Sequence, residues 1–133
     1  MTKKTILVTD DEPGYREMLK KILVQKGFDV LTAESGVDAL SVMRKQPVDL
    51  VLTDMKMPKS DGVNLVIAIK KFHSHIPVVI MTGFAMEENI KKVMDEKACA
   101  CLKKPFNIDD MVKTITTALR QAPAKPQNDG AKA

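Results

Sequence analysis

Aromatic residues are scarce in this sequence. Four phenylalanines, one tyrosine and no tryptophan make up 4% of the 133 residues, too few to supply the ring surfaces on which nucleic acid bases stack. The net charge of +4 would suit a nucleic acid, but the lysines are dispersed along the chain in pairs, which is typical of solvated helix surfaces. We therefore expect no direct binding to nucleic acid.

Cysteine is also scarce, because Cys99 and Cys101 are the only two. Their C-x-C spacing fits neither a zinc site nor a redox pair. On a strand, their side chains would point to the same face about 6 to 7 Å apart, beyond easy disulfide reach. We expect both to be reduced packing residues.

The sequence lacks any long apolar run. No stretch approaches the roughly 20 residues that a membrane helix needs, and the first residues lead into a predicted strand without the apolar core of a signal peptide. We therefore expect a cytoplasmic protein with no membrane partner. The length and the 44% hydrophobic content predict one domain, and a chain of this size can fold without metal or disulfide.

Short apolar runs alternate with segments of helical periodicity along the chain. Parallel strands need crossover connections, usually helices, so this alternation predicts an α/β fold with helices on both faces of a parallel sheet. We expect a doubly wound five-stranded parallel sheet of order 2-1-3-4-5. The predicted strands cover residues 6–8, 28–33, 50–52, 77–81 and 100–103.

Capping and turn residues mark the ends of the predicted helices. Pro13 suits a first helical turn, and Gly27 ends that helix. A capping box at residues 35–38 opens a helix that ends before Pro47, and residues 107–110 open the last one. The apolar residues expected to face inward are Tyr15, Met18, Leu19, Ile22, Leu23, Leu40, Met43, Leu65, Val66, Ile69, Met86, Ile90, Val93, Met94, Met111, Val112, Ile115 and Leu119.

The last residues differ in kind from the rest of the chain. Residues 121–133 are rich in Ala, Pro, Lys and small polar residues and have no periodicity. We expect one domain at residues 1–120 and a disordered tail or linker remnant at 121–133.

Polar residues stand where the predicted strands end. Asp54 follows the apolar run 50–52, and taken alone it could equally be a turn or capping residue. The order 2-1-3-4-5, however, brings the ends of the first and third strands together at the point where open α/β sheets bind ligands. Asp10 and Asp11 would then meet Asp54 there. Three neighbouring carboxylates repel one another, and a divalent cation such as Mg²⁺ relieves that repulsion.

Thr82 and Lys104 arrive at the same edge from the fourth and fifth strands. A hydroxyl donor and a cation opposite the carboxylates suit phosphoryl oxygens. Read alone, each would be an ordinary turn or surface residue, so only their convergence points to a site. The motifs at or just beyond the strand ends are Asp10-Asp11, Asp54, Met57-Pro58, Asp61-Gly62, Thr82-Gly83 and Lys104-Pro105-Phe106.

In order and spacing, these motifs resemble those of response-regulator receiver domains of two-component signalling, the family of the chemotaxis regulators. The resemblance covers the chain from about Lys4 to Leu119 and implies the flavodoxin-like (βα)5 fold. It implies that Asp54 is the phosphoacceptor and nucleophile, taking a phosphoryl group from a phosphohistidine. Mg²⁺ would be held by Asp10, Asp11, Asp54 and the backbone carbonyl of Lys56.

The resemblance also implies a phosphoryl-binding set. This set comprises Met57, Thr82, Gly83 and Lys104, with Asp54, Thr82 and Lys104 as the catalytic residues. A cis Lys104-Pro105 peptide would aim the lysine inward. The domain would catalyse its own phosphotransfer and autodephosphorylation without being a conventional enzyme.

Regulation is implied at four positions. Lys56 and Phe84 match residues that tune the rate of autodephosphorylation, and Thr82 belongs to the conformational switch. Most receivers carry Tyr or Phe at the second switch position, where this chain has Cys101. We therefore expect the coupling between Asp54 and the signalling surface to be altered or weaker.

The implied partners are proteins. Upstream stands a sensor histidine kinase or phosphotransfer protein, and downstream a protein target or a missing effector domain. A dimer could form through the helix that carries Met86 to Met94, the strand 100–103 and the last helix. The sequence identifies neither the kinase nor its signal.

Three other functions compete with this one. A pseudo-receiver would act as a phosphorylation-independent interaction module, but the phosphoacceptor, acidic pair, threonine and lysine are all in place. A flavin protein is disfavoured because acids at the site would repel a flavin phosphate and no tryptophan can stack on the ring. A phosphohydrolase would place its first two aspartates two residues apart, whereas Asp10 and Asp11 are adjacent.

Overall fold

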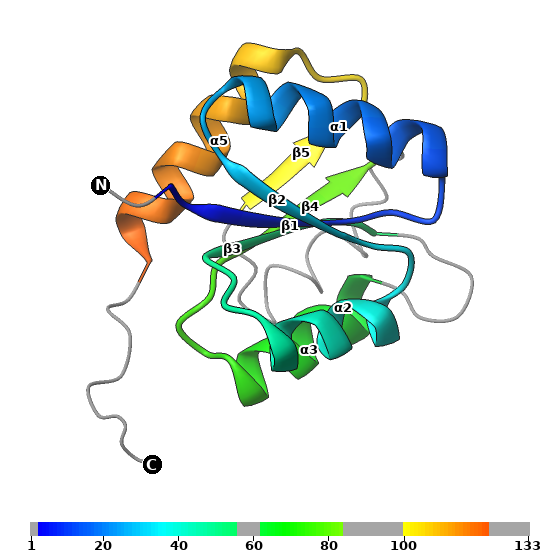
Figure 1. Cartoon of the computed structure of the whole chain (residues 1–133), viewed down its shortest axis with the longest axis vertical. Coiled ribbons are helices and arrows are strands. Elements are labelled where there is room, and N and C mark those ends of the chain that lie inside the picture. Colours follow the sequence, from blue (N-terminus) through cyan, green and yellow to red (C-terminus); the bar gives the residue numbers. More distant parts are fainter. Residues whose placement is uncertain (1–2, 56–61, 84–99, 123–133) are drawn as a thin grey trace.

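A central sheet with helices on both faces forms the structure, a computed structural model that describes residues 3–55, 62–83 and 100–122. Helices α1 and α5 cover one face of the sheet and α2 and α3 the other (Figure 1). The elements are β1 (Thr5–Thr9), α1 (Pro13–Gln25), β2 (Asp29–Ala33), α2 (Gly36–Lys45), β3 (Leu50–Asp54), α3 (Gly62–Phe72), β4 (Val78–Thr82), β5 (Ala100–Lys103) and α5 (Ile108–Gln121).

The sheet has the predicted topology. Its five strands are all parallel and lie in the order β2-β1-β3-β4-β5. In the β1–β3 pair, Val8 lies opposite Leu52 and Thr9 opposite Thr53. The ends of these two strands therefore meet at one edge of the sheet, as the sequence predicted.

The strands bury side chains on both of their faces. Ile6 and Val8 belong to the core cluster shared with α1 and α5, whereas Leu7 between them belongs to the cluster shared with α2 and α3. All three side chains are fully buried. This explains the short, continuous apolar runs in the sequence, because a strand covered on both faces has no polar side.

Among the described residues, one that was predicted to face inward lies at the surface. Met18 is 45% exposed, although Leu19 and Leu23 of the same helix are buried. At 100° per residue, Met18 lies at the margin of the apolar face, where it lines a surface pocket rather than the core. The helical spacing was right, and only the width of the buried face was overestimated.

The predicted capping residues close the helices. Ser35 Oγ accepts a hydrogen bond from the Asp38 N–H at 3.1 Å at the start of α2. Asn107 Oδ1 accepts one from the Asp110 N–H at 2.7 Å at the start of α5. Each bond satisfies a backbone donor that lacks a partner within the helix.

Gly27 ends α1 with a positive φ of 96°, a left-handed conformation in which a side chain is strained. We expect Gly27→Ala to lower the free energy of unfolding by about 1 kcal/mol. No heavy atom lies within 4 Å of a Cβ built at this position or at Gly14, the second residue of α1. Gly14→Ala is therefore the matched control, and urea unfolding followed by circular dichroism should show no loss for it. Equal losses in the two variants would contradict the backbone explanation.

Among the residues described, no helix is long and apolar enough to cross a membrane. The boundary between the domain and the tail stays a prediction. Helix α5 continues to Gln121, one residue past the predicted domain boundary. The expected helix around residues 86–94, Cys99 and the tail residues 123–133 lie outside the described residues.

Candidate phosphoacceptor site

Three carboxylates meet at the ends of β1 and β3. Oxygens of Asp10, Asp11 and Asp54 lie within 4.8 Å of one another. The backbone holds this geometry beyond the strands themselves, because the Asp10 N–H donates to the Ala33 carbonyl at 3.1 Å and the Met55 N–H donates to Met81 at 2.9 Å. The predicted convergence of the three acids is confirmed.

Asp10 is the most deeply buried of the three, with 1% of its surface exposed. Its Oδ1 accepts a hydrogen bond from the Glu12 N–H at 2.9 Å, while its buried Oδ2 has no hydrogen-bond partner in the described part of the chain. Burial raises the pKa of Asp10 above its usual value, the negative charges of Asp54 and Asp11 add to that rise, and the Glu12 hydrogen bond and Lys104 oppose it. The site is thus short of positive charge.

The donor set fits a hard divalent cation. Mg²⁺ takes oxygen ligands and is commonly held by one or two carboxylates together with water. Asp10 offers a buried oxygen that no described residue hydrogen-bonds, and Asp11 on the exposed side leaves an approach from solvent. The same arrangement costs free energy without a cation, because like charges at this distance repel one another.

Lys104 lies against the carboxylates. Its Nζ is 3.8 Å from Asp10 Oδ2 and 3.7 Å from Asp54 Oδ2. The Lys104 N–H donates to the Thr82 carbonyl at 2.7 Å, so the end of β5 stays attached to the end of β4. The Lys104-Pro105 peptide is cis, as predicted.

The remaining predicted residues fall into two groups. Thr82 is buried at the end of β4 with Gly83 after it, and Cys101 is half-buried in β5 against the core cluster of α2 and α3. Burial raises the pKa of the Cys101 thiol, which keeps it in the neutral form of a packing residue. The second group lies outside the described residues: Lys56, Met57 and Phe84.

Two contacts of the site were not predicted from the sequence. The Tyr15 ring lies under Lys104 Nζ, 4.4 Å from the ring centroid, and Arg16 Nη1 donates to the Asp10 carbonyl at 2.6 Å. Burial, and then the charges of Asp10 and Asp54, raise the pKa of Tyr15. The only sequence signal for these contacts was that Tyr15 and Arg16 lie near the start of α1, since the start of a helix lies beside the end of the strand that precedes it.

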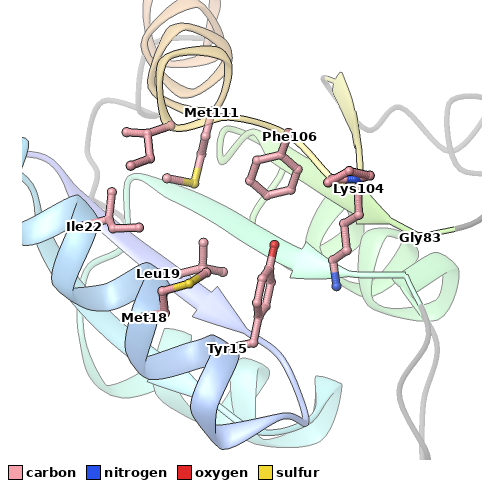
Figure 2. A pocket seen from close by; sticks show the side chains of 10 residues that line it. Tyr15, Met18, Leu19, Ile22, Gly83, Lys104, Phe106 and Met111 are labelled. Atoms are coloured by element: carbon pink, nitrogen blue, oxygen red, sulfur yellow. The ribbon is translucent and has the colours of Figure 1, made fainter.

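A surface pocket of about 340 Å³ adjoins the site. Figure 2 shows Tyr15 and Met18 of α1 on one side of it and Phe106 and Met111 on the other. Lys104 stands at one end of the pocket, beside Tyr15 (Figure 2). The polar site formed by the carboxylates and Lys104 therefore continues into an apolar depression between α1 and the start of α5.

The comparison with known protein families identifies the family of this chain. The family model of the response regulator receiver domain matches residues 6–116, which include the acidic cluster and, apart from Thr5, all the described strands. The chain belongs to the response-regulator receiver domains. The resemblance drawn from the motifs is confirmed, as is the flavodoxin-like fold class.

Known receiver-containing proteins of several kinds are similar to this chain. The sporulation initiation phosphotransferase F of Bacillus subtilis is 33% identical over 84% of this chain and 90% of its own length. The sensor histidine kinase RcsC of Escherichia coli is 37% identical over 84% of this chain, and the chain spans 12% of its length. The transcriptional regulatory protein GlrR of Escherichia coli is 35% identical over 90% of this chain and 27% of its own length.

Solved structures agree with this assignment. A response regulator receiver domain protein from Clostridium thermocellum superposes with a TM-score of 0.84 at 36% identity, covering 88% of this chain and 94% of that one. A CheY-like receiver domain protein from Methanospirillum hungatei superposes with a TM-score of 0.86 at 28% identity, covering 90% and 95%. Nearly the whole of each of these two structures is covered, so the similarity extends over the complete receiver fold.

Proposed function

We propose that this receiver domain accepts a phosphoryl group on Asp54 in a Mg²⁺-dependent reaction and signals through a protein-binding surface that responds to phosphorylation. The observation that carries the proposal is the cluster of three carboxylates with Lys104 Nζ 3.7 Å from Asp54 Oδ2. In the proposed reaction, an Asp54 oxygen attacks the phosphorus of a phosphohistidine. The P–O bond forms as the P–N bond breaks, and the imidazole leaves.

Asp10 and Asp11 would hold the Mg²⁺ together with Asp54, and the backbone carbonyl of Lys56 is proposed as a further ligand. The metal ion supplies positive charge where two anions must approach each other. The buried Oδ2 of Asp10 supports this assignment, because it has no hydrogen bond in the described part of the chain. Without positive charge beside it, such a carboxylate is costly to keep ionised.

Lys104 and Thr82 would bind the phosphoryl oxygens. Lys104 is already placed beside the proposed acceptor, and Thr82 ends the neighbouring strand β4. Backbone groups at Met57 and Gly83 are proposed to complete the phosphoryl-binding set. Charge-assisted bonds of this kind favour the transition state, in which negative charge spreads over the phosphoryl oxygens.

The proposed phosphodonor is a sensor histidine kinase or a phosphotransfer protein. It is supported by relatives in which a receiver occurs within a histidine kinase, within a transcriptional regulator or as a phosphotransferase. The downstream target, an effector domain, a dimer, the cytoplasmic location and the rate-tuning roles of Lys56 and Phe84 stay predictions. So does the altered coupling expected from Cys101 at the switch position.

Intact mass after incubation with acetyl phosphate and Mg²⁺ tests the proposal. We expect the wild type to gain the mass of one phosphoryl group and Asp54→Asn to gain none, because an amide cannot act as the nucleophile. Asp49→Asn is a matched control, since Asp49 precedes the same strand but lies away from the cluster. It should be phosphorylated like the wild type.

The result also separates the receiver from the pseudo-receiver. If the wild type gains no mass and binds no beryllofluoride, the chain acts as a phosphorylation-independent interaction module. If Asp54→Asn gains mass as fast as the wild type, Asp54 is not the acceptor.

A further inference from the structure

The position of Lys104 is not fixed by its ion pairs alone. The distances of 3.8 and 3.7 Å from Lys104 Nζ to Asp10 and Asp54 are longer than a hydrogen bond. The lysine side chain is also 26% exposed and ends a flexible four-carbon stem. Two long ion pairs leave such a side chain free to change rotamer.

Tyr15 supplies a third contact of a different kind. Its ring centroid is 4.4 Å from Lys104 Nζ, well within the range in which an aromatic face attracts an ammonium group. Figure 2 shows the ring of Tyr15 rising from α1 toward the segment that carries Lys104 and Phe106. The contact joins the first helix to the end of the last strand.

Tyr15 is itself held by packing. It is half-buried and packs against the core cluster on the α1 and α5 side of the sheet. Leu19, one helical turn further along α1, is 1% exposed and belongs to that cluster. The ring is therefore a fixed surface, whereas the lysine is flexible.

We propose that Tyr15 is a positioning residue for Lys104, and this rests on the proposed function of Lys104 as a phosphoryl-binding group. When a cation and a phosphoryl group enter the site, Asp10 and Asp54 acquire other partners and their ion pairs with Lys104 weaken. The contact with the ring does not depend on either carboxylate, so it keeps Lys104 Nζ within reach of the phosphoryl oxygens. Tyr15 would thus reduce the number of lysine rotamers that compete with the productive one.

The rate of phosphorylation by acetyl phosphate, read by intact mass, tests the proposal. We expect Tyr15→Leu to lower the initial rate about 2- to 5-fold, the ratio that a partly exposed cation–π contact corresponds to. Tyr15→Phe keeps the ring face and should react like the wild type. Met18→Leu is the control, because Met18 lines the same pocket, and its rate should not change. In a Lys104→Met background, Tyr15→Leu should have no further effect on the rate that remains.

A second measurement reads the contact itself, without phosphorylation. Proton NMR of the metal-free protein should show the ε-protons of Lys104 shifted upfield by the ring, in the wild type and Tyr15→Phe but not in Tyr15→Leu. Lys104→Met identifies these signals by their loss. Unshifted ε-protons of Lys104 in the wild type would overturn the proposal. Equal phosphorylation rates for Tyr15→Leu and Tyr15→Phe would also overturn it, provided that the wild type is phosphorylated. A wild type that takes no phosphoryl group would overturn the proposed function as well.

Discussion

Replacing Leu52 with Ala is expected to lower the free energy of unfolding by about 3 to 4 kcal/mol. Leu52 lies in the middle strand of the sheet, is fully buried and belongs to the cluster packed under α1 and α5. Removing its side chain leaves a cavity that β3 cannot close, because β1 and β4 hold it on both sides.

Urea unfolding followed by circular dichroism measures this loss. Val37→Ala is the control, since Val37 is 69% exposed on α2 and should change the free energy of unfolding by less than about 0.5 kcal/mol. A loss below about 1 kcal/mol for Leu52→Ala would show that this part of the core is poorly packed.

Asp10→Asn is expected to stabilise the metal-free protein at pH 7 by about 1 to 2 kcal/mol, because it removes a buried charge that Lys104 only partly compensates. The amide oxygen of Asn can still accept the hydrogen bond from the Glu12 N–H. The change thus removes charge while leaving the local turn intact. Thermal unfolding in EDTA measures the difference, and Asp29→Asn, at an exposed carboxylate, should show none.

The difference should depend on pH with a definite sign. The pKa of Asp10 is raised in the folded protein, chiefly by burial, so the folded state holds this proton more tightly than the unfolded state. The stability that Asp10 contributes is fully present below its unfolded pKa of about 3.9 and is lost as the pH rises through the folded pKa. The gain from Asp10→Asn should therefore be largest at neutral pH and fade toward pH 4.

Mg²⁺ should raise the free energy of unfolding of the wild type more than that of Asp10→Asn. At a concentration ten times its dissociation constant, a ligand that binds only the folded state adds about 1.4 kcal/mol. We expect a stabilisation of this kind in the wild type and little of it in Asp10→Asn, which has lost a ligand charge. An equal response in both proteins would remove Asp10 from the proposed metal site.

Most of the fold could be predicted because its determinants are local. The short apolar runs around Leu7 and Leu52, the helix stop at Gly27 and the caps at Ser35 and Asn107 each act within a few residues. The parallel sheet then follows from the alternation of strands and helices, and it brings Asp10 and Asp54 together without further information.

The contacts missed from the sequence are those that depend on side-chain direction. Tyr15 was expected to be one apolar residue among several on a helix face, and it does pack against the core. Nothing in its spacing shows that its ring also contacts Lys104. The exposure of Met18 has the same origin, because the edge of a helix's apolar face is set by the neighbouring helix and loop. Arg16 was missed because its partner is a backbone carbonyl, which leaves no trace in a sequence pattern.

The order of the strands gives the two sides of the site different local stabilities. The carboxylates extend from β1 and β3, each hydrogen-bonded to a strand on both sides, while the lysine follows β5, which lies at the edge of the described sheet. Interior strands open only with much of the domain, whereas an edge strand can open at lower free energy and on a shorter timescale. We therefore expect a change of charge at Asp54 to cause conformational adjustment first on the side of Lys104, at β5 and the start of α5.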